Sequence, residues 1–332
     1  MTATARIRVL AAAADRAAHP NGDRPPSRDG HPTHAPCPDC GRAATVLTDR
    51  PDGAVVRHGS AVAKAHAADT DRAALAVRVG VAAHPLLAGV LLPPLGGPVG
   101  GTAGPEVLTV WPRGAPVDPE APDAAPWEEA AALLARLHSV EPAALPGPLP
   151  PMRGPAKAAR ALARMRAADP GPAAEPVLRA WHGLPGWARD EAPAPRGSFL
   201  CHGDLHLGQL VRHPVDGGPW QLIDVDDLGL GEPAWDLARP AAWYAAGLLA
   251  PGTWARFLAA YRAAGGPAVC SDGDPWPELD VPARTLTVQA AALALAKSAA
   301  AGRPLDGAER MMLDSCARIA GVPAELAPGA AS

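Results

Sequence analysis

Alternating apolar and polar residues dominate the chain from residue 44 to residue 111. Tight-turn sequences, of which Pro-Asp-Gly at 51–53 is typical, separate the first runs and indicate antiparallel pairing. The pattern predicts strands at residues 44–50, 54–59, 61–67, 89–95 and 106–111. Residues 69–83 place apolar side chains at helical spacing behind Asp or Thr residues that can cap a helix. A small antiparallel sheet with one helix is therefore expected over residues 43–113.

After a connector rich in Pro, Asp and Ala at residues 112–126, the period changes to that of amphipathic helices. Helices are predicted at residues 127–140, 155–168, 176–184, 236–249, 253–264, 283–302 and 306–320. Strand-like runs at 208–213 and 220–225, joined by a Pro- and Gly-containing turn, predict a hairpin among these helices. The pattern indicates an α+β protein with a sheet lobe at 43–113 and a larger, mainly helical lobe at 114–325 that carries the hairpin.

The first 42 residues differ from the rest of the chain. A short helical stretch of Ala and Arg precedes a segment of Pro, Gly, Asp and His with too few apolar residues to pack. We interpret residues 1–42 as a flexible arm. Within it, His31, His34, Cys37 and Cys40 follow one another at intervals of three, and Cys-Pro-x-Cys-Gly is typical of half a zinc knuckle. The alternatives are a structural Zn²⁺ site and an unstructured segment with free thiols.

Charge and hydropathy narrow the class of partner. The net charge of −4 leaves no basic surplus for binding nucleic acid or an anionic membrane. No apolar run reaches the roughly 20 residues of a membrane helix, and charged residues interrupt the N-terminal stretch before a signal sequence develops. A cytoplasmic protein without nucleic-acid or membrane partners is expected. The cations are almost all arginine, so a retained lysine is a better candidate for a functional residue than usual. The chain has three: Lys64, Lys157 and Lys297.

Acidic residues lie at both ends of the predicted hairpin. Asp204 precedes it and Asp224 ends its second strand, so the hairpin brings two carboxylates toward one cleft. Phosphoryl transfer needs such an arrangement, because one carboxylate orients the acceptor hydroxyl while another holds the Mg²⁺ that bridges the nucleotide phosphates. We assign Asp204 as the base and Asp224 as a metal ligand, with the amide oxygen of Gln209 as a second ligand.

The motifs around these residues resemble those of the aminoglycoside phosphotransferase family. The segment HGDLHLGQ at 202–209 resembles its catalytic loop, LIDVDD at 222–227 its metal-binding strand, and GEPAWDLARP at 231–240 the segment that follows. The resemblance spans residues 43–320 and implies a bilobal protein-kinase-like fold and an ATP-dependent kinase.

The resemblance also implies roles for individual residues. Lys64 would neutralise the α- and β-phosphates of ATP. His202 would pack the catalytic loop, and Asp236 would be a buried acceptor for backbone N–H groups of that loop. The hinge LTVWPRG would line the adenine pocket through Thr109, Val110 and Trp111.

Two departures from the family pattern affect this interpretation. Gln209 replaces the family's asparagine, which keeps the amide oxygen but moves it outward by one methylene. Actinobacterial maltokinases and glucosamine kinases, which this stretch also resembles, share HGDLHLGQ. No glutamate occurs between Lys64 and Glu106, so the predicted helix cannot provide the Lys–Glu ion pair of kinases, and the nearby Asp69 and Asp71 can merely cap it.

Several side chains near the motif have alternative roles. His202 and His206 have the i, i+4 spacing of a zinc pair, but the chain leads into a strand and no third ligand stands out. A structural or substrate-side role is favoured, and His206 is assigned to the acceptor side. Asp226 and Asp227 either form a solvated acidic turn or line the acceptor pocket, where they would suit an amine-bearing or polyhydroxylated substrate.

The sequence therefore predicts a cytoplasmic kinase that uses ATP and Mg²⁺. Its acceptor would be a hydroxyl of an aminoglycoside, sugar, amino sugar or related metabolite. The alternative hypothesis is a nucleotide-binding pseudokinase or scaffold, motivated by the missing helix glutamate and the N-terminal arm. The expected partners are the nucleotide and a small-molecule acceptor, and the oligomeric state stays open.

Overall fold

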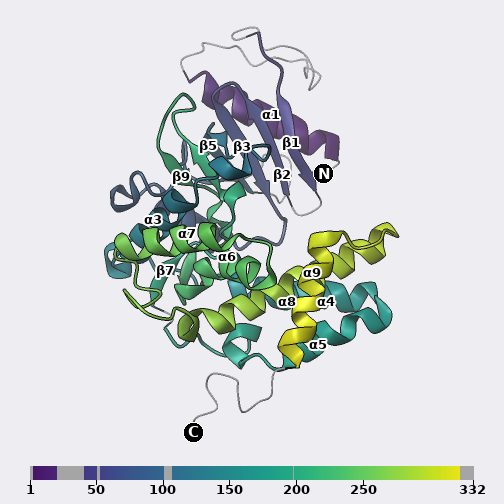
Figure 1. The fold of residues 1–332 in the computed structure, drawn as a ribbon. Coiled ribbons are helices and arrows are strands. Elements are labelled where there is room, and N and C mark those ends of the chain that lie inside the picture. The colour runs from purple at the N-terminus through teal and green to yellow at the C-terminus, as the bar shows by residue number, and fades with distance from the viewer. Residues whose placement is uncertain (1–2, 21–40, 51–52, 101–106, 197, 322–332) are drawn as a thin grey trace. The chain divides into compact units, whose positions relative to one another are not determined.

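The computed structural model describes residues 3–20, 41–50, 53–100, 107–196 and 198–321 (Figure 1). The chain forms two compact units. The first, here called the sheet unit, comprises Met1–Asp118, Leu145–Leu149 and Leu210–Asp226. The second, the helical unit, comprises Pro119–Ala144, Pro150–Gln209 and Asp227–Ser332.

A five-stranded antiparallel sheet forms the centre of the sheet unit, with the order β1-β2-β3-β5-β4. Its strands are β1 (Thr45–Arg50), β2 (Gly53–His58), β3 (Ala61–His66), β4 (Val99–Gly100) and β5 (Val107–Pro112). The predicted strand at 89–95 is wrong, since only Leu91 forms a bridge, to Leu222. Pro93 and Pro94 lack the N–H groups that a ladder needs.

Helices cover both faces of this sheet. Helix α1 (Ala3–Ala18) lies against the sheet (Figure 1). It buries Ile7, Leu10, Ala13 and Ala14 against small residues of β2 and β3. On the other face, α2 (Arg72–Ala82) packs its apolar side against Val107 and Trp111.

The helix α1 corrects two expectations. Residues 3–18 are not part of a flexible arm, and the sheet unit has a second helix besides the predicted one. The physical reason is the apolar spacing of α1, which covers the alanine-rich face of the sheet. Residues 21–40, with the predicted zinc ligands His31, His34, Cys37 and Cys40, lie outside the described residues.

The predicted hairpin is present and belongs to the sheet unit. It pairs β8 (Leu210–Arg212) with β9 (Trp220–Leu222), and β6 (Ala115–Pro116) extends it on the β8 side. Leu222 exchanges backbone hydrogen bonds of 2.9 Å with Val90 and Leu92, which attaches the hairpin to the segment after α2. The predicted lobe boundary at 113/114 had grouped this hairpin with the helices.

Seven α-helices lie in the described part of the helical unit, close to the positions that periodicity predicts. They are α3 (Trp127–His138), α4 (Gly154–Ala168), α5 (Glu175–His182), α6 (Ala234–Ala246), α7 (Pro251–Ala263), α8 (Trp276–Ala301) and α9 (Gly307–Ala320). Helix α8 packs against α4, α6 and α9 around a core that includes Leu162, Met165 and Ala291. Two short strands, β7 (Phe199–Cys201) and β10 (Gly229–Gly231), pair beside the catalytic-loop motif.

Short 3-10 turns connect these elements. They are η1 (Pro85–Leu87), η2 (Pro122–Ala124), η3 (Pro142–Ala144), η4 (Gly171–Ala174), η5 (Gly186–Arg189), η6 (Leu207–Gln209) and η7 (Val225–Asp227). None of the helices in the described residues is long and apolar enough to cross a membrane. The predicted fold class, a small antiparallel-sheet unit with a larger, mainly helical one, is confirmed.

Candidate active site

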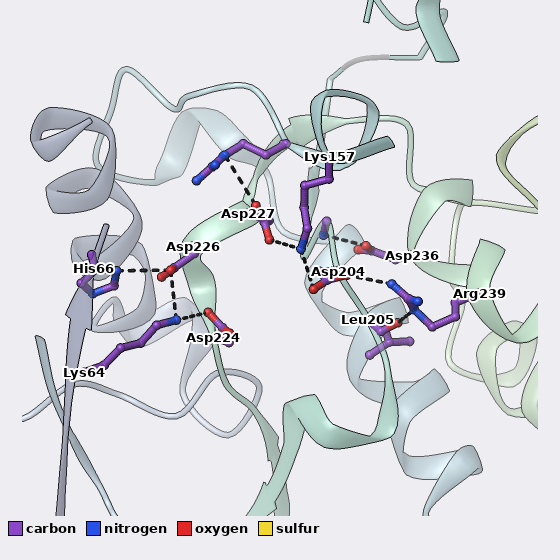
Figure 2. A network of polar contacts seen from close by, with 12 residues as sticks. Lys64, His66, Lys157, Asp204, Leu205, Asp224, Asp226, Asp227, Asp236 and Arg239 are labelled. Carbon is purple, nitrogen blue, oxygen red and sulfur yellow. Dashed lines mark hydrogen bonds and ion pairs between the residues drawn. The ribbon is translucent and has the colours of Figure 1, made fainter. Parts of the chain in front are cut away.

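Lys64 is the centre of an ion-pair cluster in the sheet unit (Figure 2). Its Nζ lies 2.6 Å from Asp224 Oδ1 and 3.0 Å from Asp226 Oδ2. Burial opposes the charge of Lys64, but the two carboxylates outweigh it and raise the pKa of the amine. Burial likewise opposes the charge of Asp226, yet Lys64 and His66 hold the pKa of its carboxyl well below the usual range. Lys64 therefore stays protonated beside the ionised carboxylate of Asp226.

The position of Lys64 follows from strand alternation and strand register. Ala63 and Ala65 face α1, so Lys64 and His66 point to the opposite face of β3. Lys64 pairs with Thr109 of β5, and the side chains of directly opposite residues share a face. The site thus lies on the face of the sheet opposite α1.

Asp224 has a backbone conformation that supports a functional role. Its φ is 65°, in the left-handed region that side chains other than glycine, asparagine and aspartate rarely adopt. The other described non-glycine residues with positive φ, Asp169 and Asp190, are C-caps of helical segments, where this conformation is common. Asp224 lies between β9 and η7 instead, and strain of this kind is concentrated at functional sites.

The structure supplies acidic partners for Lys64 that the sequence pattern lacked. The family's helix glutamate is missing, and Asp71 caps α2 by accepting a 3.0 Å hydrogen bond from the backbone N–H of Ala74. Asp224 and Asp226 take the place of that glutamate. Asp226, for which the sequence left open a solvated acidic turn or the acceptor pocket, here contacts Lys64 and His66.

A chain of hydrogen bonds continues from Asp226 to the predicted hinge. His66 Nδ1 lies 3.2 Å from Asp226, its Nε2 lies 2.8 Å from Thr109 Oγ1, and Trp111 Nε1 donates to the same oxygen at 2.9 Å. The ionised Asp226 carboxylate can only accept, so the Nδ1–H of His66 donates to it. In a neutral imidazole, Nε2 then accepts from the Thr109 hydroxyl, whose oxygen accepts from Trp111. The buried Thr109 side chain is committed to this chain of bonds. A role of Thr109, Val110 and Trp111 at the adenine stays a prediction.

Asp204 is the centre of a second cluster, in the helical unit (Figure 2). Lys157 Nζ of α4 lies 2.6 Å from Asp204 Oδ2 and 2.7 Å from Asp227 Oδ2, and Arg239 Nη2 of α6 donates to Asp204 Oδ1 at 2.8 Å. Arg153 Nε is 3.6 Å from Asp227 Oδ1. Burial opposes ionisation of Asp204, but Lys157 and Arg239 outweigh it and lower the pKa of its carboxyl. Asp204 is therefore ionised and held from two sides.

A buried carboxylate holds the backbone of the loop that carries Asp204. Asp236 is 1% exposed and accepts the backbone N–H of His202 at 2.6 Å and that of Gly203 at 2.7 Å. His138 Nε2 contacts the same carboxylate at 3.0 Å, and Tyr261 Oη contacts His138 Nδ1 at 2.8 Å. This network fixes the loop in one conformation.

Gly203 is required where it stands. Its φ is +84°, and a Cβ there would lie 2.5 Å from the backbone oxygen of Asp227. The close approach of these two segments places Asp204 next to Asp227, so one lysine reaches both carboxylates.

Two other predicted residues of the loop, His206 and Gln209, are placed by contacts and burial. His206 accepts the N–H of Gly208 at its Nδ1, at 3.0 Å, and burial lowers the pKa of its imidazole. Among the described residues, no group of three side chains that could hold a metal ion includes both His202 and His206. Gln209 is buried at the end of η6, directly before β8.

Sequence reasoning missed the cations of the second cluster. Lys157 and Arg239 lie in helices whose periodicity says only that these positions are polar, and Arg153 is the N-cap residue of α4. The one available signal is the scarcity of lysine, because Lys64 and Lys157 are two of the three lysines in the chain.

The chain matches the model of a known protein family. The model of the phosphotransferase enzyme family matches residues 46–280, more than half of the 332 residues. The chain belongs to this phosphotransferase family. The resemblance to aminoglycoside phosphotransferases is thereby confirmed, whereas the similarity to maltokinases finds no support in the comparisons. A search of curated proteins returns no match.

Solved structures of this phosphotransferase family and of related kinases share the fold. A thermostable mutant of aminoglycoside phosphotransferase APH(4)-Ia is 15% identical, with coverage of 85% of this chain and 96% of that chain and a TM-score of 0.56. A choline/ethanolamine kinase family protein from Mesorhizobium loti is 18% identical, with coverage of 88% and 93% and a TM-score of 0.51. At these identities the likeness establishes the fold and leaves the substrate open.

Proposed function

We propose that the protein transfers the γ-phosphoryl group of ATP to a hydroxyl of a small molecule, with Asp204 as the base. The observation that carries this proposal is the state of Asp204. A base must be ionised and fixed before the acceptor binds, and Asp204 is paired with Lys157 and Arg239 on a loop that Asp236 holds. Most of the rate enhancement would come from positioning and charge neutralisation.

Nucleotide binding is assigned to the sheet unit. Lys64 would contact the phosphates, and the backbone of Thr109, Val110 and Trp111 would line the adenine pocket. Carboxylate and amide oxygens suit Mg²⁺, and the donor atoms of Asp224 and Gln209 are of this kind, so these two residues would hold the ion. When bound, Mg²⁺ would neutralise charge on the transferring phosphates. Gln209 directly precedes β8 and Asp224 follows β9 by two residues, so both flank one hairpin.

The main observation in favour of the pseudokinase alternative no longer holds. That hypothesis rested on the missing partner of Lys64, and a lysine without an acidic partner would be poorly held. Asp224 and Asp226 provide two carboxylates within 3.0 Å. The cluster therefore favours an active enzyme.

Replacement of the base tests the proposal directly. Asp204→Asn keeps the size and hydrogen-bonding capacity of the side chain but removes its ability to take a proton. Magnesium-dependent ADP release with a panel of hydroxyl acceptors should fall at least about 100-fold, the lower end of general-base contributions. Nucleotide affinity by calorimetry should stay close to that of the wild type, and Asp272→Asn, at an exposed site of the same unit, is the matched control. Full turnover by Asp204→Asn would refute the assignment.

A further inference from the structure

The hydrogen bonding of His206 leaves one of its ring nitrogens open near the proposed base. Its Nδ1 accepts the backbone N–H of Gly208 at 3.0 Å, so in a neutral imidazole the proton lies on Nε2. Burial lowers the pKa of the ring more than the nearby Asp204 raises it, so the ring is neutral near pH 7. Among the described residues, Nε2 has no hydrogen-bond partner, and protein atoms do not bury it.

Two other histidines of the site show the contacts of a structural ring. His66 and His138 are buried, and each bonds protein groups through both ring nitrogens at 2.8–3.2 Å. Such a ring has no polar atom left for a ligand. His206 is partly exposed and uses Nδ1 alone, so its Nε2–H is a donor for a molecule that binds here.

Gly208 holds the His206 ring in this state. A Cβ at Gly208 would lie 2.8 Å from Cε1 and 2.9 Å from Nδ1 of the ring, so a larger residue would displace it. The backbone N–H of Gly208 also faces Nδ1, and a proton on Nδ1 would meet another donor. The loop therefore selects the tautomer that carries its proton on Nε2.

His206 and Asp204 share the accessible side of the loop. They flank Leu205, whose side chain is buried and whose carbonyl accepts a 2.9 Å hydrogen bond from Arg239 Nε. Asp204 and His206 both stay partly exposed, and each changes the pKa of the other, so the two groups are close. A proton acceptor and a neutral donor thus lie together where the proposed reaction brings the acceptor hydroxyl.

We infer that His206 is a further catalytic residue, whose Nε2–H donates a hydrogen bond to an acceptor oxygen next to the hydroxyl that is phosphorylated. The inference rests on the proposed function and adds a requirement on its substrate. An ammonium group has only donors and cannot accept this bond, so the acceptor carries a hydroxyl or ether oxygen at that place. In the reaction, the hydroxyl oxygen bonds to the γ-phosphorus, the bond from that phosphorus to the oxygen of ADP breaks, and the hydroxyl proton passes to Asp204. His206 keeps its proton throughout.

The tautomer of His206 is measured by NMR of the full chain with isotope-labelled histidine, in which His206→Gln identifies the signal. A neutral ring with its proton on Nε2 is expected at neutral pH. A proton on Nδ1, or a doubly protonated ring, overturns the inference.

Two substitutions separate the donor from the rest of the ring. His206→Gln can place an amide N–H near the position of Nε2, whereas the shorter His206→Asn reaches only the position of Nδ1. We expect kcat/KM for the acceptor, from ADP release with glucose, glucosamine or maltose, to fall about tenfold in His206→Asn and at most about twofold in His206→Gln. The KM of ATP should stay unchanged in both variants. Equal losses in the two variants would overturn the inference, because a structural role does not depend on where the donor lies.

A second variant leaves His206 itself in place. Gly208→Ala displaces the ring and should lower kcat/KM about as much as His206→Asn, whether or not His206→Asn folds stably. Gly307→Ala, where a Cβ would meet nothing within 4 Å, is the control that leaves activity unchanged. Wild-type kcat/KM in a folded Gly208→Ala would contradict the inference.

Turnover and binding distinguish this inference from the proposed function. Turnover that depends on Asp204 but is equal in the two His206 variants supports the proposed function and overturns the inference. If none of the three sugars is turned over, the proposed function loses support, and titration of the labelled ring with the same sugars decides the inference. A shift of the Nε2–H signal then supports a ligand contact at His206, and an unmoved signal overturns it.

Discussion

Removal of the Lys157 ammonium group should weaken both the catalytic step and the fold. Lys157→Met keeps a long apolar stem in α4 but takes away the charge that lies 2.6 Å from Asp204 and 2.7 Å from Asp227. Arg239 then remains as the partner of Asp204, and Arg153, at 3.6 Å, as the partner of Asp227. Each carboxylate loses its shortest contact with a cation.

The burial of Lys157 and Asp204 sets the expected loss in the free energy of unfolding. The Lys157 side chain is 25% exposed and that of Asp204 is 18% exposed, so the pair lies between a surface and a buried ion pair. Surface pairs contribute about 0.2–1 kcal/mol, whereas removal of one partner of a buried pair costs about 3–5 kcal/mol. We expect Lys157→Met to lower the free energy of unfolding by about 1–3 kcal/mol. A loss of similar size in transition-state stabilisation lowers kcat/KM about 5- to 150-fold.

The pKa shift of Asp204 predicts how the effect of Lys157→Met depends on pH. Lys157 and Arg239 lower the pKa of Asp204 against the effect of burial, so removal of Lys157 raises that pKa. The stability that an aspartate with a lowered pKa contributes is present above its unfolded-state pKa and is lost as pH falls through its folded-state pKa. In Lys157→Met this loss begins at a higher pH, and the acid limb of the kcat/KM profile moves in the same direction.

The measurement is a pH profile of kcat/KM for ADP release, with urea unfolding at each pH. Lys297→Met replaces the third lysine, which is exposed on α8, and serves as the control. Lys157→Arg should restore most of the activity and return the acid limb toward the wild type. A uniform fall in kcat/KM at every pH, with the acid limb unmoved, would refute a role of Lys157 in the ionisation of Asp204.

Three further substitutions probe the rest of the site. Asp226→Asn should weaken nucleotide binding by about 1 kcal/mol, because Lys64 keeps only Asp224 as a charged partner; unchanged affinity by calorimetry would count against the Lys64–Asp226 pair. Asp236→Asn should destabilise the protein by about 1–3 kcal/mol in urea unfolding, since an amide N–H group replaces one of the two oxygens that accept backbone N–H groups and leaves a buried donor without an acceptor. Gly203→Ala should cost at least about 1–3 kcal/mol, and more than Gly302→Ala, because both glycines have positive φ but a Cβ at Gly302 would meet nothing within 4 Å; equal losses would contradict the steric argument.

Local periodicity was sufficient to predict most of the elements. Apolar spacing places α3 to α9 close to where the structure has them, because the signal lies within each segment. The strand predicted at 89–95 failed, since an apolar run with two prolines cannot form a ladder. Packing of α1 was missed because its partner, the alanine-rich face of β2 and β3, lies about 40 to 60 residues away along the chain.

The residues of the candidate site were likewise predictable only where a local motif contains them. Motif spacing indicates Asp204 and Asp224, since these residues lie in contiguous segments with a recognisable order. The ion pairs Lys157–Asp204 and Lys64–Asp226 join residues 47 and 162 positions apart, and no short pattern specifies them. The scarcity of lysine indicates Lys64 and Lys157 as candidates but does not predict which acidic residues pair with them.

The consecutive residues Asp226 and Asp227 show why charge must be assigned from contacts. As a sequence, they form one acidic turn that would suit an amine-bearing acceptor. In the structure, each belongs to a different lysine: Asp226 completes the partners of Lys64, and Asp227 completes those of Lys157. Both carboxylates thus pair with lysines, so neither is a free acidic group for an amine-bearing acceptor.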